Sequence, residues 1–549
     1  MTAPIRRASA CRLAFVRADS PPVPWNRRIA RAARAWARRC AGARITTLTP
    51  VRMPVRMPAL MPVFALAVAG CTTAGPSFEP TPIEAPAQWA QQHGGPATLA
   101  APQDDVSAWP ADPWSVFGDP ALARLQARAR QAGPDVRSAA LRLLQSRVQE
   151  TTVSAQRGVQ LAAQGAATRE RQSEFGSASR LVSTIGGANQ EPLLQALSSP
   201  FTLFQAGFDA SWEPDLWGRV LRSEEAARAH TDVQRAELRQ IRLSVSAELA
   251  RAYFALRAAQ RQQALAQDAL DTGAQLEALL QAQVARGLID DSALLAQRSQ
   301  QASLQAALPA LLAQEVQAIN QISLLCGAAP GALNDDLQPR PADTPAPVWP
   351  DLQLGLPSAL AQRRADVAAA EAQLHAATAG IGIAVADLYP RVTLGASFGL
   401  ESVGIGHVRD WDARQWSVGP SLSIPLWDHG RRQSVITLRE LQQQEAAVAY
   451  QQTVLKAWHE VDGAIAAYVS ETRRDVQFDA RVHHAQDELA LSRSRYDHGL
   501  TTYQPVLAAR TRWLDAQRER SDSVQRVQTA WTALVKAMGD DGAPMPDGA

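Results

Sequence analysis

The chain has 549 residues and four Cys, of which only Cys71 and Cys326 lie beyond residue 70. Residues 1–70 hold thirteen Arg and one acid, so the remainder carries 42 basic against 52 acidic residues, a formal net charge of −10. This acidic balance argues against nucleic acid as a partner, since a phosphate backbone is bound through basic surface.

The amino-terminal region contains two segments that we expect to precede the folded chain. Residues 1–52 are Arg-rich, and we interpret them as a misassigned extension ahead of a true start at Met53 or Met57. Residues 53–70 end in the apolar run Leu-Ala-Val-Ala-Gly, which is too short for a permanent membrane helix and is typical of a cleaved lipoprotein signal peptide. Cys71 would then become the amino terminus and carry lipid, as an N-palmitoyl and S-diacylglycerol cysteine.

Residues 71–118 are expected to form a lipidated tether and an amino-terminal segment. The tether begins with Thr-Thr-Ala-Gly-Pro, a polar sequence that predicts a flexible chain. Thr72 follows the expected lipid site, where lipoproteins held in the inner membrane commonly have Asp. The resemblance to lipoproteins therefore favours the outer membrane.

The second half of the chain repeats the first at a fixed offset. Identical residues recur 212 positions apart: Gly218 and Gly430, Glu248 and Glu460, Gly287 and Gly499, Gly327 and Gly539. Nearer the start of each repeat the offset is 231, as between Asp135 and Asp366. A fixed period of this kind predicts two copies of one unit. We assign residues 119–335 to repeat 1, 336–354 to a linker, 355–540 to repeat 2 and 541–549 to a disordered tail.

Each repeat is expected to contain a pair of strands. Four segments alternate apolar and polar residues: Val159–Thr168, Thr202–Glu213, Arg391–Glu401 and Trp416–Leu426. Alternation over about ten residues suits a tilted strand that crosses a membrane, although an ordinary half-buried sheet has the same pattern. Aromatic residues near the strand ends favour the membrane: Phe204, Trp212, Trp416 and Trp427. Residues 169–200, between the first two strands, are expected to form a long exposed loop.

The strand pairs are predicted to lie between helices, in the order helix, strand, strand, long helix, turn, helix. The segment from Gly218 to Gly287 would span on the order of 100 Å as one helix. Apolar residues recur there at spacings of three and four, as in a coiled-coil seam: Leu238, Ile241, Val245, Leu249, Tyr253 and Leu256. A cytoskeletal rod would share these helices but would not explain the strands.

No group of residues suggests catalysis. His483 and His484 lie near Asp487, but adjacent helical side chains point about 100° apart, which does not suit one metal ion. Cys326 follows two Leu residues and is expected to be a buried apolar side chain. The sequence therefore predicts no enzyme, cofactor or metal site, and energy for any transport must come from another protein.

Four strands cannot close a barrel alone, because about eight are the practical minimum. An open edge in lipid leaves backbone groups unpaired, at several kcal/mol each. Closure therefore requires several copies. A dimer would give a lumen filled by side chains, and a trimer would give an open pore.

Several segments together resemble the TolC-type outer-membrane efflux proteins, in their NodT/OprM-like lipoprotein branch. The segments are Trp114–Leu125 (WSVFGDPALARL), Phe204–Arg219 (FQAGFDASWEPDLWGR), Gly355–His375 (GLPSALAQRRADVAAAEAQLH), Ala386–Leu400 (ADLYPRVTLGASFGL), Tyr496–Gly499 (YDHG) and Leu514–Gln517 (LDAQ). The resemblance covers nearly all of residues 71–540. It implies an α+β membrane protein: a homotrimer with a twelve-stranded β-barrel, four strands from each chain, continued by a long periplasmic α-helical barrel.

The resemblance also implies a function and partners. It predicts the outer-membrane channel of a tripartite efflux pump, which passively conducts drugs or other small molecules. A periplasmic adaptor and an inner-membrane transporter of the RND type would be its partners, together with outer-membrane lipid and no nucleic acid. An exit duct for type I protein secretion shares the fold, and a structural coiled-coil lipoprotein without a pore is the other alternative.

The resemblance gives roles to the turns between the long helices. It places Gly287, Leu288, Gly499 and Leu500 at the periplasmic tip, where the adaptor makes contact. Its tunnel is narrowest there, which makes four residues candidates for the constriction: Asp290, Asp291, Tyr496 and Thr501. Thr501 departs from the family pattern, in which Asp is frequent just past the second turn.

Overall fold

The computed structural model describes residues 73–79, 84, 86, 112–176, 180, 190–339, 349 and 363–539. The chain divides into two units, Met1–Gly70 and Cys71–Ala549, and all of the described residues belong to the second. The predictions for residues 1–70, for Cys71 and for the tail therefore lie outside the described residues.

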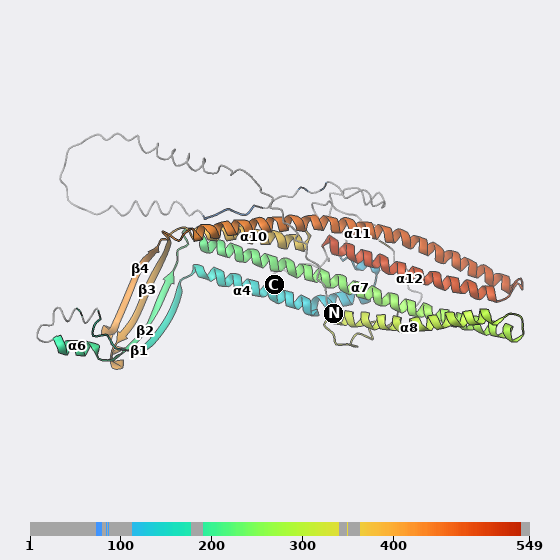
Figure 1. The fold of residues 1–549 in the computed structure, drawn as a ribbon, viewed down its shortest axis with the longest axis horizontal. Helices are drawn as coiled ribbons and strands as arrows, with labels where there is room; N and C mark the ends of the chain where they lie inside the picture. The colour runs from blue at the N-terminus through green and yellow to red at the C-terminus, as the bar shows by residue number, and fades with distance from the viewer. Residues whose placement is uncertain are drawn as a thin grey trace, which may run out of the picture. The chain divides into compact units, whose positions relative to one another are not determined.

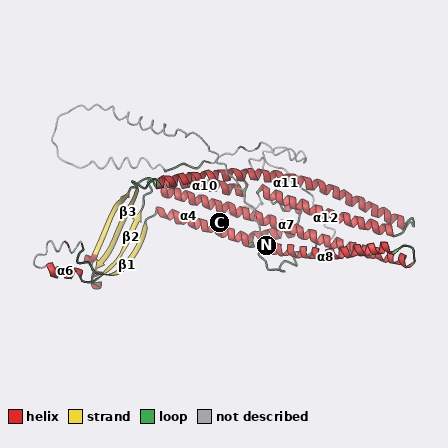
Figure 2. Cartoon of the chain, in the orientation of Figure 1, coloured by secondary structure: helices red, strands yellow, loops and turns green. Residues whose placement is uncertain are grey.

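The second unit contains the expected elements in the expected order (Figures 1 and 2). It also contains a short helix, α6, within residues 169–200, where the sequence predicted only a loop, so that prediction is wrong for Gln190–Ser198. In repeat 1 they are η4 (Ser115–Phe117), α3 (Pro120–Ala132), α4 (Pro134–Ser154), η5 (Ala155–Arg157), β1 (Gln160–Glu170), α6 (Gln190–Ser198), β2 (Phe201–Trp212), α7 (Arg219–Ala285) and α8 (Asp291–Leu325). In repeat 2 they are α10 (Ala365–Ala386), β3 (Arg391–Ser402), η7 (Ile405–His407), η8 (Trp411–Ala413), β4 (Arg414–Ser423), α11 (Arg431–Asp497) and α12 (Gln504–Met538).

The long helices begin in the same way in both repeats. Each has 67 residues and follows a glycine in the left-handed region, Gly218 with φ of 74° and Gly430 with φ of 81°. A carboxylate just ahead of each glycine accepts a hydrogen bond from the first turn: Asp215 from the Leu221 amide at 2.8 Å, and Asp428 from the Arg432 amide at 3.3 Å. Free amides at a helix start need such acceptors.

The core of the unit lies between the helices. α7 packs against α4, α8, α10 and α12, while α11 packs against α10 and α12. The predicted seam along α7 is confirmed, because Leu249, Tyr253 and Leu256 are fully buried in one cluster with Trp531 of α12. No helix in the described ranges is both long enough and apolar enough to span a membrane.

The four strands form one antiparallel sheet in the order β1-β2-β3-β4. The observed strands begin and end within three residues of the predicted ones. The register places Phe208 opposite Ala163 on one side and Phe398 on the other, and Phe398 opposite Trp416. The outer edges of β1 and β4 have no partner strand within the described residues.

Arg364, which directly precedes α10, joins three helices of repeat 2. Its guanidinium, 5% exposed, donates to Asp366 at 2.7 Å, to Glu460 of α11 at 2.6 Å and to the Ala537 carbonyl of α12 at 2.8 Å. A Cβ at Gly539 would lie 2.7 Å from this side chain, so only glycine fits beside it. Burial raises the pKa of Asp366, but Arg364 outweighs it and holds that pKa below its usual value.

Candidate functional site

The turn after α7 is closed by two backbone hydrogen bonds. The Gly287 amide donates to the Val284 carbonyl at 2.9 Å and the Leu288 amide donates to the Gln283 carbonyl at 3.0 Å. Together with φ of 67° at Gly287, these bonds define a Schellman motif, which favours glycine at that position.

The turn after α11 repeats this geometry. Gly499, with φ of 71°, donates to the Tyr496 carbonyl and Leu500 donates to the Arg495 carbonyl, both at 2.8 Å. Because each turn ends one long helix that starts at the sheet, both turns lie at the helix ends remote from the sheet (Figure 1).

The two turns expose a leucine where a Schellman motif usually has an apolar contact. Leu288 is 67% exposed and Leu500 is 77% exposed. The helix positions they would cover, Gln283 and Arg495, are polar. Both leucines are therefore available to a partner.

The turns differ in the residues that start the returning helices. Asp290 precedes α8, accepts hydrogen bonds from the amide and hydroxyl of Ser292, and has its pKa lowered by them. Tyr503 holds the same place before α12 without a capping side chain, and its ring lies 5.0 Å from that of Tyr496. One turn is therefore acidic and the other is aromatic. Asp291 is exposed and Thr501 is partly buried beside them.

One face of the sheet carries a network of polar side chains. The amides of Gln205 and Gln415 donate to one oxygen of Glu401 at 2.8 and 3.1 Å, so that three strands are joined. Ser397 and Ser417 form a further pair at 2.8 Å. The register places all of these side chains on the face that the strand alternation predicts to be polar.

The opposite face of the sheet is apolar and not covered by the core. Phe208, Phe398 and Trp416 lie in one row across three strands, and they are 54%, 44% and 70% exposed. A continuous row of large exposed aromatics is a surface for another apolar medium or protein. The sheet thus presents water-compatible and apolar faces back to back.

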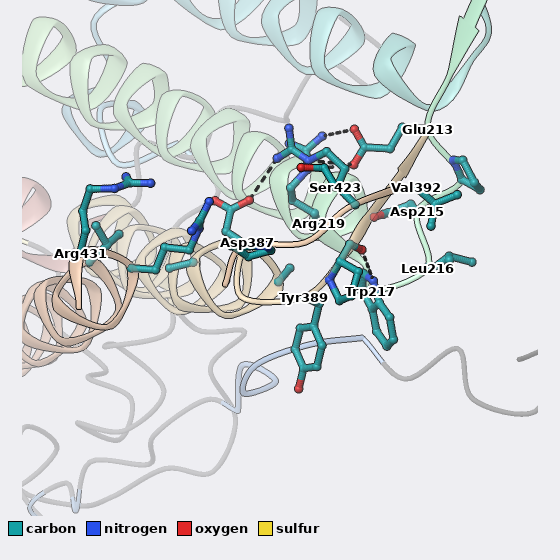
Figure 3. Close-up of a pocket in the computed structure, with 18 residues that line it drawn as sticks. Glu213, Asp215, Leu216, Trp217, Arg219, Asp387, Tyr389, Val392, Ser423 and Arg431 are labelled. Atoms are coloured by element: carbon teal, nitrogen blue, oxygen red, sulfur yellow. Dashed lines mark hydrogen bonds and ion pairs between the residues drawn. The ribbon is translucent and has the colours of Figure 1, made fainter. Parts of the chain in front are cut away.

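A pocket lies where the sheet meets the helices (Figure 3). Its volume is about 320 Å³. Glu213 accepts two hydrogen bonds from Arg219, at 3.1 and 3.3 Å, and its carboxylate lies 3.8 Å from Arg391. The Trp217 indole donates to the Pro390 carbonyl at 2.8 Å and stacks on Tyr389 at 4.7 Å.

These junction contacts were not anticipated from the sequence. The only local signal is the cluster of charged residues and Trp beside the Gly-Arg helix start. Apart from the local pair of Glu213 and Arg219, the contacts join residues more than 170 positions apart, such as Trp217 and Pro390. They fix the end of β2 and the start of β3 to the ends of α7 and α10.

Two further side chains that the sequence singled out, Cys326 and His483, lie in surroundings typical of structural residues. Cys326 is fully buried, and burial raises the pKa of its thiol to about 11. His483 lies 3.7 Å from Asp479. In the part of the chain that the structure describes, no three His, Cys, Asp or Glu residues gather as metal ligands.

Known proteins resemble this chain in both sequence and fold. The family described as outer membrane efflux protein matches residues 125–328 and 356–540. The pyoverdine export outer membrane protein OpmQ of Pseudomonas putida is 28% identical over 483 residues, which cover 86% of this chain and 95% of that protein. The outer membrane protein OprJ of Pseudomonas aeruginosa is 30% identical over 348 residues, 60% of this chain and 68% of that protein. The solved outer-membrane channel OprN superimposes with a TM-score of 0.71 at 27% identity, covering 85% of this chain and 99% of that one.

Proposed function

The chain belongs to the outer membrane efflux protein family, and from that premise we propose that three copies close into one channel that discharges small molecules from a tripartite pump. The family is one of channels in the outer membrane rather than enzymes. The observation that carries the proposal is the four-stranded sheet, which has one polar face and two edges without a partner strand among the described residues. Backbone groups at an edge must be paired inside a membrane, so the sheet needs further copies.

The internal repeat supplies a template for the contact between copies. Repeat symmetry makes β4 equivalent to β2 at the offset of 212, and β1 equivalent to β3 at the offset of 231. Within the chain, β2 pairs with β3 and α7 packs against α10. The equivalent contacts join β4 and α11 of one copy to β1 and α4 of the next.

This template fixes the strand register between copies. Inside the chain Ala210 lies opposite Ala396. Their equivalents at the two offsets are Leu422 and Gly165, so Leu422 of one copy is expected to lie opposite Gly165 of the next. Three such contacts close twelve strands into a barrel with the polar face inside. A barrel of twelve strands is wide enough for an open pore.

Cysteine cross-linking tests the register and the number of copies together. With Leu422→Cys and Gly165→Cys on one chain, mild oxidation in membranes should give covalent dimers and trimers on a denaturing gel, because directly opposed strand residues lie within disulfide reach. Leu422→Cys with Leu161→Cys is the matched control, since four residues shift the partner by about 13 Å along the strand. A ladder that stops at the dimer would contradict the trimer, and efficient linking of the control pair would contradict the register.

We propose that the two exposed leucines are the adaptor contacts and that the acidic turn narrows the tunnel. Leu288 and Leu500 support the first role because their side chains extend from rigid turns without an intramolecular cover. Asp290 and Asp291 support the second role, because three copies would bring six carboxylates to one ring and favour cations. Tyr496 and Thr501 complete the candidates at the second turn.

One pair of variants separates these two roles. In planar bilayers, Asp290→Ala with Asp291→Ala is expected to reduce the preference for cations over anions, because the carboxylates are lost. Leu288→Ser with Leu500→Ser adds no charge, so it should leave that preference unchanged but abolish binding to the periplasmic adaptor of the same pump, measured with the purified proteins. If the leucine variants still bind the adaptor, or if the alanine variants keep the selectivity, the corresponding role is wrong.

We also propose that Cys71 carries the lipid that anchors the chain. The small residues before Cys71 and the short apolar run ahead of them support this role. The first described residue, Thr73, follows two positions later.

A further inference from the structure

The residues that follow the expected lipid site lie against the helices. We call residues 73–79 the strap. The Ala74 amide donates to the Trp217 carbonyl at 3.0 Å, just before α7 begins. The Phe78 ring stacks on His375 of α10, with 4.4 Å between centroids and 17° between planes. These contacts place the strap along the seam between α7 and α10, in a segment for which the sequence predicted a flexible tether.

Arg222 of α7 holds the backbone of the strap. Its side chain is 6% exposed, and it donates to the carbonyl oxygens of Ala74 at 3.2 Å and Gly75 at 3.5 Å. It also donates to Glu225 at 2.7 Å, and the other oxygen of Glu225 lies 2.9 Å from the His375 ring. A buried charge of this kind needs all of its partners, since an unpaired one is costly.

The carboxylate of Glu225 ties this network together. Burial raises its pKa, but hydrogen bonds from Arg222 and His375 outweigh burial and hold the pKa below its usual value. The ionised form therefore persists near neutral pH. Arg222 binds the carbonyl groups of the strap and His375 stacks on its aromatic ring. Glu225 orients the side chains of both Arg222 and His375.

Two glycines let the strap backbone touch α10 directly. A Cβ at Gly75 would lie 2.5 Å from the Gly382 Cα, and Gly75 has φ of 82°. A Cβ at Gly382 would lie 2.9 Å from the Arg222 side chain. A larger side chain at either position would therefore separate the strap from the seam.

The equivalent seam, between α11 of one copy and α4 of the next, lacks every one of these groups. At the offsets of 212 and 231, the counterparts of Arg222, Glu225, His375 and Gly382 are Ser434, Thr437, Leu144 and Thr151. None of these replacements is charged, and none is a glycine. The site is therefore built only where α7 and α10 of the same chain meet.

We propose that this seam is a dedicated binding site for the chain's own lipid-proximal segment, which fastens repeat 1 to repeat 2 at their sheet-side ends. The ligand is the Ala-Gly-Pro-Ser-Phe stretch, residues 74–78, which is recognised through two backbone carbonyls and one aromatic ring. The link to a lipid rests on the proposed role of Cys71, whereas the docking itself does not. A seated strap transmits any pull on the anchor to both helices at once.

Hydrogen exchange measured by mass spectrometry on the full chain tests this proposal. In the unsubstituted protein, the Ala74 amide, resolved by fragmentation of a peptide that covers the strap, should exchange at least tenfold more slowly than in the denatured chain, because it donates to the Trp217 carbonyl. Arg222→Ala and Gly75→Val should each remove that protection. Arg228→Ala is the matched control: it breaks ion pairs to Glu224 and Glu150 on the α4 side of the same helix and should leave the strap protected.

Peptides from the middle of α7 report whether each variant is folded. Gly75→Val alters only the strap, so it remains informative if Arg222→Ala disturbs the helices. An unprotected strap in the unsubstituted protein, or protection that survives in either variant with α7 intact, overturns the proposal. The readout involves neither conductance nor subunit number, so a failure of the proposed channel would leave this result standing.

Discussion

Arg364→Leu is expected to lower the free energy of unfolding by about 3 kcal/mol, the cost of removing one partner from a buried ion pair. The guanidinium bonds to Asp366, Glu460 and the Ala537 carbonyl, so its loss leaves three acceptors on three helices without their donor. Leucine fills part of the space but donates nothing. The start of α10, the middle of α11 and the end of α12 should therefore loosen together.

Thermal unfolding in detergent, followed by helical circular dichroism, measures this effect. Arg363→Leu is the matched control, because the neighbouring Arg363 is exposed. The melting temperature of Arg364→Lys should lie between those of Arg364→Leu and Arg363→Leu, since a lysine keeps the charge but not the forked geometry. Equal melting temperatures for the Arg364→Leu and Arg363→Leu variants would contradict the assignment.

The ion pair of Arg364 and Asp366 also makes the stability difference between the unsubstituted protein and Arg364→Leu depend on pH. The folded-state pKa of Asp366 lies below its usual 3.8. Its stabilising contribution is therefore complete well above pH 3.8 and is lost as the pH falls through the lowered folded value. The gap between the unsubstituted protein and Arg364→Leu should stay constant near neutral pH and shrink below about pH 4.

Val418→Arg is expected to prevent stable insertion in the outer membrane, whereas Ser417→Arg, one residue away, should be tolerated. Val418 lies opposite Ala396 on the apolar face, and Ser417 lies opposite Ser397 on the polar face. An arginine on the lipid side of a barrel costs about 2–4 kcal/mol per copy near the middle of the membrane. Three copies would multiply that cost.

The yield of heat-resistant oligomer in isolated outer membranes measures the difference. Ser417→Arg also loses the hydrogen bond to Ser397, so a small decrease is expected for it. Val418→Leu controls for changed size on the apolar face and should match the unsubstituted chain. Equal losses for both arginine variants would show that the two faces have been assigned wrongly.

Local patterns were sufficient to predict the elements. Period-two alternation located all four strands within three residues, and the 212-residue offset located both long helices and their glycine turns. These features depend on neighbouring residues, which the sequence displays directly. Helix α6 was missed, because its nine residues lie in a segment rich in Ser, Gly and Asn that predicts a loop.

Contacts between distant segments were beyond the reach of such patterns. The strap carries Gly and Pro, which locally predict a flexible chain, yet Arg222, almost 150 residues away, binds its carbonyls. The pocket formed by Glu213, Trp217 and Arg391 likewise depends on the β2–β3 pairing. The sequence was sufficient to identify the turn residues, whereas the exposure of Leu288 and Leu500 could be known only from the structure.

The unpaired edges of β1 and β4 also affect the life of the chain before it reaches its membrane. A newly exported copy must cross an aqueous compartment with two strand edges that have no partner strand in the described part of the chain, next to exposed Phe398 and Trp416. Such edges pair with any extended chain they meet, which leads to aggregation. The time between export and assembly therefore determines how much protein is lost, and we expect this chain to depend on periplasmic chaperones more than a barrel that closes by itself.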